Sequence, residues 1–268
     1  MLKEITVKSN KNLKFPPTPQ TKKVYLWIGL LALFLWSAHG TKFNPLLFKD
    51  FNNTLDFINR SFLNPDWSVL PLAMKESVIT IQIAIIGTAI AFLFAVPVGF
   101  LGAKNTSPHW TIYSLIRSFL SFLRSIPEIV FALIFVPTVS LGAFAGVLAL
   151  ALHNIGVMGK LFSEIIESAD IGPQEAVTAT GAKKQIMVLY GIVPQVIPHI
   201  LSNAFYRLEV SVRASLVLGL VGAGGVGQLL SIHFKMFQYN KVAVDCLVIM
   251  TMVIIIDYVG GLLRRKVI

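Results

Sequence analysis

The sequence predicts an all-α membrane protein whose chain crosses the bilayer six times. Three observations support this fold class. Hydrophobic residues make up 55% of the 268 positions and charged residues only 13%, whereas a soluble domain has about 25% charged residues. The apolar residues form runs close to the length that a helix needs to cross a bilayer, about 20 residues. Basic residues also cluster after alternate runs, as they do in cytoplasmic loops.

The amino-terminal 23 residues are polar and basic, and we expect them to form a cytoplasmic tail. They carry six lysines against one acidic residue, and three prolines argue against a regular helix. The first apolar run, residues 24–40, is predicted to be a retained membrane helix. Because the run is short and Ala38-His39-Gly40 resembles a signal-peptidase site, a cleaved signal peptide is the alternative.

Residues 41–72 mix polar and apolar positions without net charge, and we expect them on the outer side of the membrane. Their spacing predicts an amphipathic helix on the outer membrane surface. The core face of a small outer subdomain is the alternative. Five apolar positions carry this helical spacing: Phe48, Phe51, Leu55, Ile58 and Phe62.

Residues 73–268 are predicted to form the membrane core. Its spans are expected within residues 77–101, 110–140, 141–166, 193–220 and 241–263. If the tail is cytoplasmic, the chain returns to the cytoplasm after the second, fourth and sixth spans. These returns carry Lys104, the Lys183-Lys184 pair and the Arg264-Arg265-Lys266 cluster, although Lys235 and Lys241 fall outside. The charge bias therefore predicts a multi-pass membrane protein with both termini in the cytoplasm.

Composition and motifs exclude several function classes. The net charge of +10 is explained by cytoplasmic loops, so we expect no nucleic-acid partner. The single cysteine, Cys246, excludes an intrachain disulfide and a multi-cysteine metal site. The five histidines are scattered, and no G-x-x-x-x-G-K-[ST] motif occurs. We therefore expect neither a metal site nor ATP hydrolysis by this chain, and no other enzymatic activity.

The polar segment between the fourth and fifth spans, residues 167–192, has a residue pattern that predicts a short capped helix. Pro173 suits the first position of a helix, and Glu175 lies in the first turn, where a negative charge is favoured. Gly181 can end the helix in a left-handed conformation. The segment therefore predicts a helix of about two turns, over 173–181, that lies parallel to the membrane with a face of small residues.

The spacing in this segment resembles the EAA signature of ATP-binding-cassette (ABC) importer permeases. That signature reads Glu-Ala-Ala, three residues, Gly, nine residues and Ile-any-Leu-Pro. The matching positions are Glu175, Ala176, Gly181 and Pro194, and the departures are Val177, Gly191 and Val193. The resemblance implies that this helix docks on a separate cytoplasmic ATPase, through Glu175, Ala176, Thr180, Gly181 and Pro194.

Further segments, at 124–128, 153–160 and 217–227, look like the phosphonate-transporter (PhnE-like) permease family. Together with the EAA-type segment, they extend the resemblance over most of residues 75–265. The resemblance implies a MetI-like type I ABC importer permease fold and transport of phosphonate or a related phosphorus oxyanion, such as phosphite. It also implies a second copy of the chain, two cytoplasmic ATPase subunits that bind ATP and Mg, and an outer substrate-binding protein. The chain itself is expected to lie in the lipid of the bacterial inner membrane.

Three ionisable residues in the fifth span are candidates for the translocation pathway. Glu209 and Arg213 are four residues apart, so they share a helix face and can pair, whereas Arg207 lies on roughly the opposite face. One interpretation is a structural ion pair and a structurally bonded arginine. The other is that Arg207 or Arg213 lines the path and offsets the charge of an anionic substrate.

The third and fourth spans add further pathway candidates. Arg124 and Glu128 are four apart and flank Pro127, which is expected to kink the helix into a gate. His153 and Asn154 interrupt the fourth span. Such residues usually form hydrogen bonds between helices, and a ligand role is the alternative.

The glycines Gly222, Gly224, Gly225 and Gly227 match G-x-G-x-x-G, but they follow a membrane helix and not a strand. We therefore expect a turn or gate at the outer mouth and no dinucleotide site.

Two function classes compete with the importer permease. An ion-gradient-driven secondary transporter would explain the buried charges but predicts internal repeats, and the sequence shows no convincing repeat. A membrane enzyme would need a catalytic cluster that the sequence lacks.

Overall fold

The computed structural model describes residues 20–44 and 51–267, and within them it contains helices and no strand. Contacts divide the chain into a unit of residues 1–55 and a larger unit of residues 56–268. The helices are α1 Gln20–Gly40, α2 Phe51–Ser61, α3 Leu70–Leu101, α4 Trp110–Ser125, α5 Glu128–Val139, α6 Ala143–Glu167, α7 Ile171–Ala179, α8 Lys184–Met187, α9 Val193–Leu220, α10 Gly225–Lys235 and α11 Tyr239–Val267. The all-α prediction is confirmed for this part of the chain.

Five helical stretches in the described residues are long and apolar enough to cross a membrane. They are Lys23–Gly40, Trp67–Leu101, Ala143–Glu167, Lys184–Lys235 and Tyr239–Arg265. A sixth is the pair α4 and α5, which is bent by 83° at a short break. The six predicted spans therefore correspond to these six stretches when the bent pair counts as one.

The break between α4 and α5 replaces the single kinked helix expected over 110–140. Ile126 takes an extended conformation, with φ −90° and ψ 120°, and Pro127 precedes α5. A proline disfavours the helical conformation of the residue before it and has no N–H to continue the helix. The kink was predicted at the right position, but the structure has two separate helices there and not one kinked helix.

The amino-terminal elements begin and end differently from the predicted boundaries. Helix α1 begins at Gln20, within the stretch assigned to the tail, and residues 1–19 of that tail lie outside the described residues. Helix α2 carries the amphipathic pattern over Phe51–Ser61, while Phe48 lies outside the described residues. Helix α3 begins at Leu70, directly after a short 3₁₀ turn, Trp67–Val69, that Asp66 caps. The hydrogen bond from Ser68 also lowers the pKa of the Asp66 carboxyl.

The larger unit is built around close contact between α3 and α6. A Cβ added at Gly87 would lie 2.9 Å from Leu150 Cβ, and one added at Gly99 would lie 2.9 Å from Phe162 Cβ. Small residues at such positions let helix backbones approach closely, as membrane helices require. Buried apolar side chains of α4, α5 and α9 complete the core around this pair.

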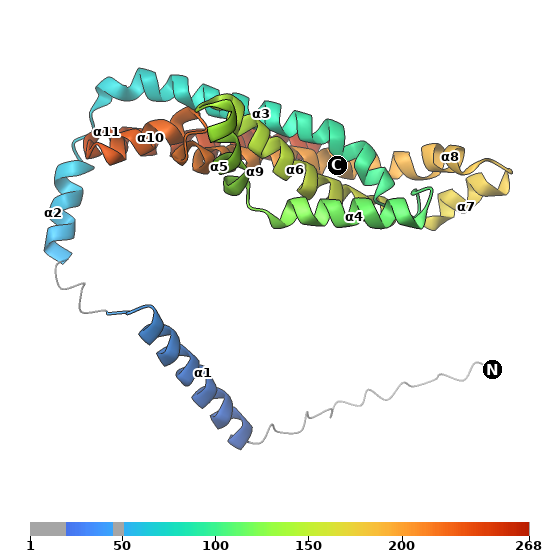
Figure 1. Cartoon of the computed structure of the whole chain (residues 1–268), viewed down its shortest axis with the longest axis horizontal. Helices are drawn as coiled ribbons and strands as arrows, with labels where there is room; N and C mark the ends of the chain where they lie inside the picture. Colours follow the sequence, from blue (N-terminus) through green and yellow to red (C-terminus); the bar gives the residue numbers. More distant parts are fainter. Residues whose placement is uncertain (1–19, 45–50, 268) are drawn as a thin grey trace, which may run out of the picture. The chain divides into compact units, whose positions relative to one another are not determined.

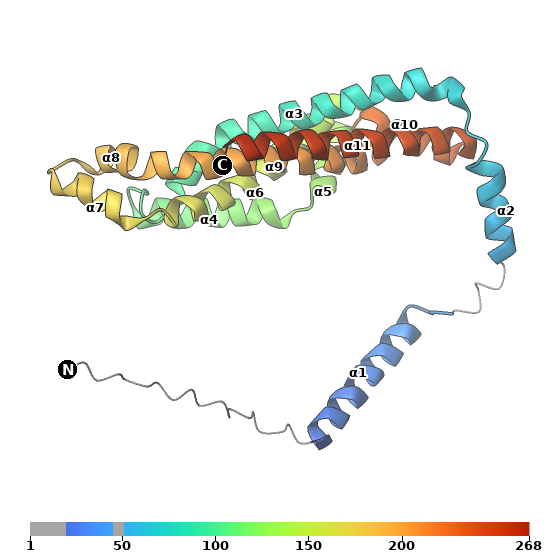
Figure 2. The ribbon, with the colours of Figure 1, turned by 180° about the vertical axis from the view of Figure 1, so that it is seen from behind.

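Within this unit, α3, α9 and α11 run along the length of the bundle (Figure 1). Helices α7 and α8 lie at one end, whereas α10 and the first turns of α11 lie towards the opposite end (Figures 1 and 2). The short helix of the 167–192 segment is thus far from the α10–α11 turn.

Candidate functional site

Helix α7 forms the short capped helix that the sequence predicts, with a corrected beginning. It starts at Ile171 and not at Pro173, because Asp170 Oδ1 accepts a hydrogen bond from the Gly172 N–H at 3.2 Å. Pro173 still lies in the first turn, where no N–H is needed. At the other end, Gly181 has φ +79° and its N–H donates to the Thr178 carbonyl at 2.9 Å. This is the left-handed ending expected for that glycine.

The residues expected to contact the ATPase are all exposed. They are Glu175, Ala176, Gly181 and Pro194, which match the EAA signature, and Thr180 within the same segment. Helix α7 has no buried residue, and Glu175 forms no ion pair with any described residue. This surface is therefore free to contact another molecule.

A buried polar network joins α3, α6 and α9 in the middle of the bundle. Asn154 is fully buried, and its Nδ2 donates to Ser211 Oγ at 2.9 Å. Arg207 Nε donates to Asn154 Oδ1 at 2.7 Å, and Thr88 Oγ1 donates to Ser211 Oγ at 2.9 Å. Ser211 Oγ in turn donates to the Arg207 carbonyl at 2.8 Å. The network fixes the guanidinium of Arg207 through one of its nitrogens.

His153 ties the α4–α5 break to α6. Its Nδ1 lies 3.0 Å from the Ile126 carbonyl and must donate there, because a carbonyl only accepts. Its Nε2 lies 3.5 Å from Glu128 Oε2. Arg124 is exposed and does not pair with Glu128, although the two are four residues apart. Glu128 instead faces His153 of α6.

The predicted pair between Glu209 and Arg213 is wrong. The buried Glu209 forms an ion pair with Arg264, and Arg213 lies 3.5 Å from Asp257 Oδ1. Both partners come from α11, which packs along this face of α9. Each of the two α9 residues therefore pairs with a charged residue of α11 and not with the other. Arg207 faces the other side of α9, as its position in the sequence predicted.

The glycine cluster breaks the helical path between α9 and α10. Gly222, Gly224 and Gly225 have φ of +95°, +83° and +72°, which side chains rarely tolerate. The Gly142 N–H donates to the Gly222 carbonyl at 2.9 Å, so this turn contacts the start of α6. Gly227 lies inside α10, where a Cβ would collide with the Leu216 carbonyl. The expected turn is present, and its role as a gate stays a prediction.

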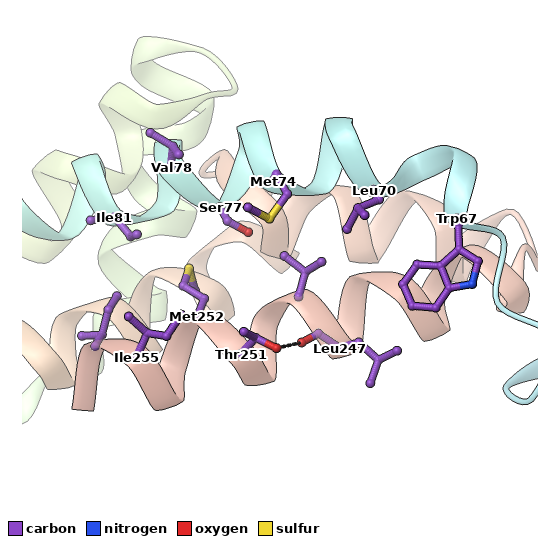
Figure 3. A pocket seen from close by; sticks show the side chains of 12 residues that line it. Trp67, Leu70, Met74, Ser77, Val78, Ile81, Leu247, Thr251, Met252 and Ile255 are labelled. Atoms are coloured by element: carbon purple, nitrogen blue, oxygen red, sulfur yellow. Dashed lines mark hydrogen bonds between the residues drawn. The ribbon is translucent and has the colours of Figure 1, made fainter. Parts of the chain in front are cut away.

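A groove of about 400 Å³ between α3 and α11 is unsuited to an anion. It is lined by apolar side chains such as Trp67, Met74 and Ile255 (Figure 3). Its only hydrogen bond drawn between lining residues runs within α11, from Thr251 Oγ1 to the Leu247 carbonyl at 2.8 Å. None of the described residues that line the groove is charged, so the polar network around Arg207 is the better candidate for anion chemistry.

Comparison with known proteins settles the family. A family model described as "Binding-protein-dependent transport system inner membrane component" matches residues 95–268. The chain belongs to this family. It is thus a multi-pass inner-membrane permease that works with a separate binding protein and an ATPase.

The names of curated relatives of this permease refer to the transport of phosphorus compounds. It is 43% identical to the phosphite transport system permease protein PtxC of Stutzerimonas stutzeri over 201 residues, which are 75% of this chain and 73% of that one. It is 38% identical to the phosphate-import permease protein PhnE of Mycolicibacterium smegmatis over 186 residues, which are 69% of this chain and 35% of that one.

The fold is that of a known importer. An inward-facing structure of the MetNI methionine ABC transporter matches with a TM-score of 0.66 at 20% identity, over 76% of this permease and 99% of the matched chain. This confirms the predicted MetI-like type I fold.

Several residues of the permease's polar core were not predicted from the sequence. Thr88 and Ser211 are common polar residues, and only Ser211 carried a signal, because it lies four positions after Arg207 on the same helix face. Gln195, which bonds the first residue of the α7 segment, was also missed. Its partner lies across a turn, so no spacing within one helix indicates the contact.

Proposed function

We propose that this permease carries phosphonate, phosphite or a related phosphorus oxyanion inward by alternating access, driven by a separate ABC ATPase. The observation that carries the proposal is the exposed helix α7, which presents the EAA-type residues at one end of the bundle. The named substrates of its relatives support the oxyanion class.

In this proposal α7 docks on the ATPase through Glu175, Ala176, Thr180 and Gly181. The end of the bundle that carries α7 faces the cytoplasm in this proposal, together with both termini and with Pro194 at the start of α9.

The assembly contains two copies of the chain, which pair about a two-fold axis with the pathway between them. Two ATPase subunits bind on the cytoplasmic side. ATP and Mg bind the ATPase, so this chain is a non-catalytic subunit that needs no cofactor. The binding protein delivers substrate at the opposite end, and lipid surrounds the assembly.

In this proposal the polar network holds the residue that faces the pathway. Arg207 offers guanidinium N–H groups to the oxyanion, since planar donors and a fixed charge suit phosphorus–oxygen anions. Asn154 and His153 hold the surrounding helices. The break at Arg124 and Glu128 acts as the inner gate, and the glycine turn at 222–227 acts as the outer gate.

The test of the proposal replaces Glu175 with alanine and Gly181 with proline in one protein. Proline fixes φ near −65°, so it cannot adopt the left-handed ending of α7. We expect ATP-dependent uptake to fall at least about tenfold while the permease still folds, because the docking surface is lost and a tenfold change needs only about 1.4 kcal/mol of coupling. Uptake of phosphite into proteoliposomes with the ATPase and binding protein measures this.

The matched control is Gly181→Asn, because asparagine tolerates the left-handed conformation. It is expected to retain most of the uptake. Wild-type uptake by the double variant, or uptake that follows an ion gradient and not ATP, would overturn the proposal.

A further inference from the structure

The side chain of Gln195 connects the beginning of α7 to α9. Its Oε1 accepts a hydrogen bond from the Asp170 N–H at 2.9 Å. Its Nε2 donates to the Asp170 carbonyl at 3.2 Å and to the Gly191 carbonyl at 2.5 Å. One carboxamide therefore satisfies both backbone groups of the residue that caps α7.

A carboxamide is the side-chain group that fits this arrangement. It presents an acceptor and a two-proton donor side by side, which matches a backbone C=O and N–H. A carboxylate of the same size could accept from the Asp170 N–H but could donate to neither carbonyl. The contact thus depends on the chemistry of Gln195 and not only on its volume.

A second contact lies next to the first. Gly191 belongs to the π-helical turn Val188–Ile192 that leads into α9. A Cβ added there would lie 3.1 Å from Gln174 Cα and 3.3 Å from the Pro173 carbonyl, so the backbone of α7 rests directly on this turn. We call these two contacts, made by Gln195 and Gly191, the α7–α9 seam.

The seam is important for α7 because that helix has no buried side chain of its own. Gln174 Nε2 donates to the carbonyls of Ala169 and Asp170, at 3.1 and 2.9 Å, which ties α7 to the linker that precedes it. Apart from the connecting residues 180–192, the seam links α7 to the beginning of α9, and Arg207 lies further along the same helix.

We propose that the α7–α9 seam is the positioning device that transmits movement of α7 to the pathway helix α9. This inference rests on the proposed function, since it assumes that an ATPase moves α7. Gln195 and Gly191 are positioning residues, because neither is placed against substrate or nucleotide. The seam predicts a specific phenotype: a permease that still binds its ATPase but transports little for each ATP hydrolysed.

The test is Gln195→Glu, which keeps the volume and the bond from Asp170 but sets a carboxylate oxygen against two carbonyls. The purified permease is reconstituted with its ATPase and binding protein, and phosphite uptake is measured per ATP hydrolysed. We expect the ATPase to remain bound and this ratio to fall at least about fivefold, the lower range of typical coupling between sites. Gln185→Glu is the matched control, because it adds the same charge to the exposed face of α8, and its ratio is expected to match wild type.

A second variant, Gly191→Ala, tests the same seam without added charge and is expected to lower the ratio too. A wild-type ratio in Gln195→Glu would overturn the inference and leave the proposed function intact. Loss of the bound ATPase would also overturn it, because the seam would then build the docking surface and not transmit its movement. If the unaltered permease shows no ATP-dependent uptake, the proposed function itself fails.

Discussion

Arg207→Gln is expected to lower phosphite uptake at least about tenfold, because a hydrogen bond to a charged group contributes roughly 1.5–3 kcal/mol. The guanidinium is held by Asn154 within the buried network, so its position is fixed before an anion arrives. Glutamine retains an amide donor in this region but removes the positive charge. ATP-driven uptake in proteoliposomes measures the effect.

Two further variants separate a pathway role from a structural one. Arg207→Lys keeps the charge and is expected to retain more uptake than Arg207→Gln. Arg213→Gln removes a charge from the other face of α9, where Arg213 faces Asp257, and is expected to change uptake little. Full uptake by Arg207→Gln would show that the arginine only supports the helix packing.

The ion pair between Glu209 and Arg264 is expected to dominate the stability of the α9–α11 contact. Arg264→Ala leaves the carboxylate of Glu209, whose side chain is only 6% exposed, without its partner. Breaking a buried pair from one side costs about 3–5 kcal/mol. A corresponding drop in the free energy of unfolding, measured by denaturation in detergent, is the expected result.

The neighbouring Arg265 provides the control. It is exposed and forms no ion pair with a described residue, so Arg265→Ala is expected to change the free energy of unfolding by less than about 1 kcal/mol. The double variant Glu209→Leu/Arg264→Met removes both charges and is expected to recover most of the loss, since apolar replacements of buried pairs are often neutral. Equal stability of Arg264→Ala and Arg265→Ala would contradict the assignment.

Most of the fold follows from patterns within single helices. Apolar runs locate the long helices, and Gly181 locates the end of α7, because these signals depend only on neighbouring residues. The position of Pro127 likewise indicated the break in the third span. The angle between α4 and α5 could not be predicted from the sequence, because it depends on the packing of His153 and the surrounding helices.

The candidate site was less predictable because it depends on the register between helices. The spacing of Glu209 and Arg213 allowed a pair, but the structure brings Arg264 and Asp257 from α11 against them. Nothing within α9 specifies that register. Gln195 is a similar case, because its partner Asp170 belongs to a separate helix and the bonds go to backbone groups.

The contact between α7 and an ATPase can be detected by cross-linking. A photoreactive residue replaces Glu175 in the assembled transporter, and the same residue replaces Met236. Met236 is exposed and lies in the turn between α10 and α11, and this turn is at the opposite end of the bundle from α7. We expect a cross-link to the ATPase from position 175 and none from position 236. A cross-link from position 175 to the outer binding protein, or none to any partner, would contradict it.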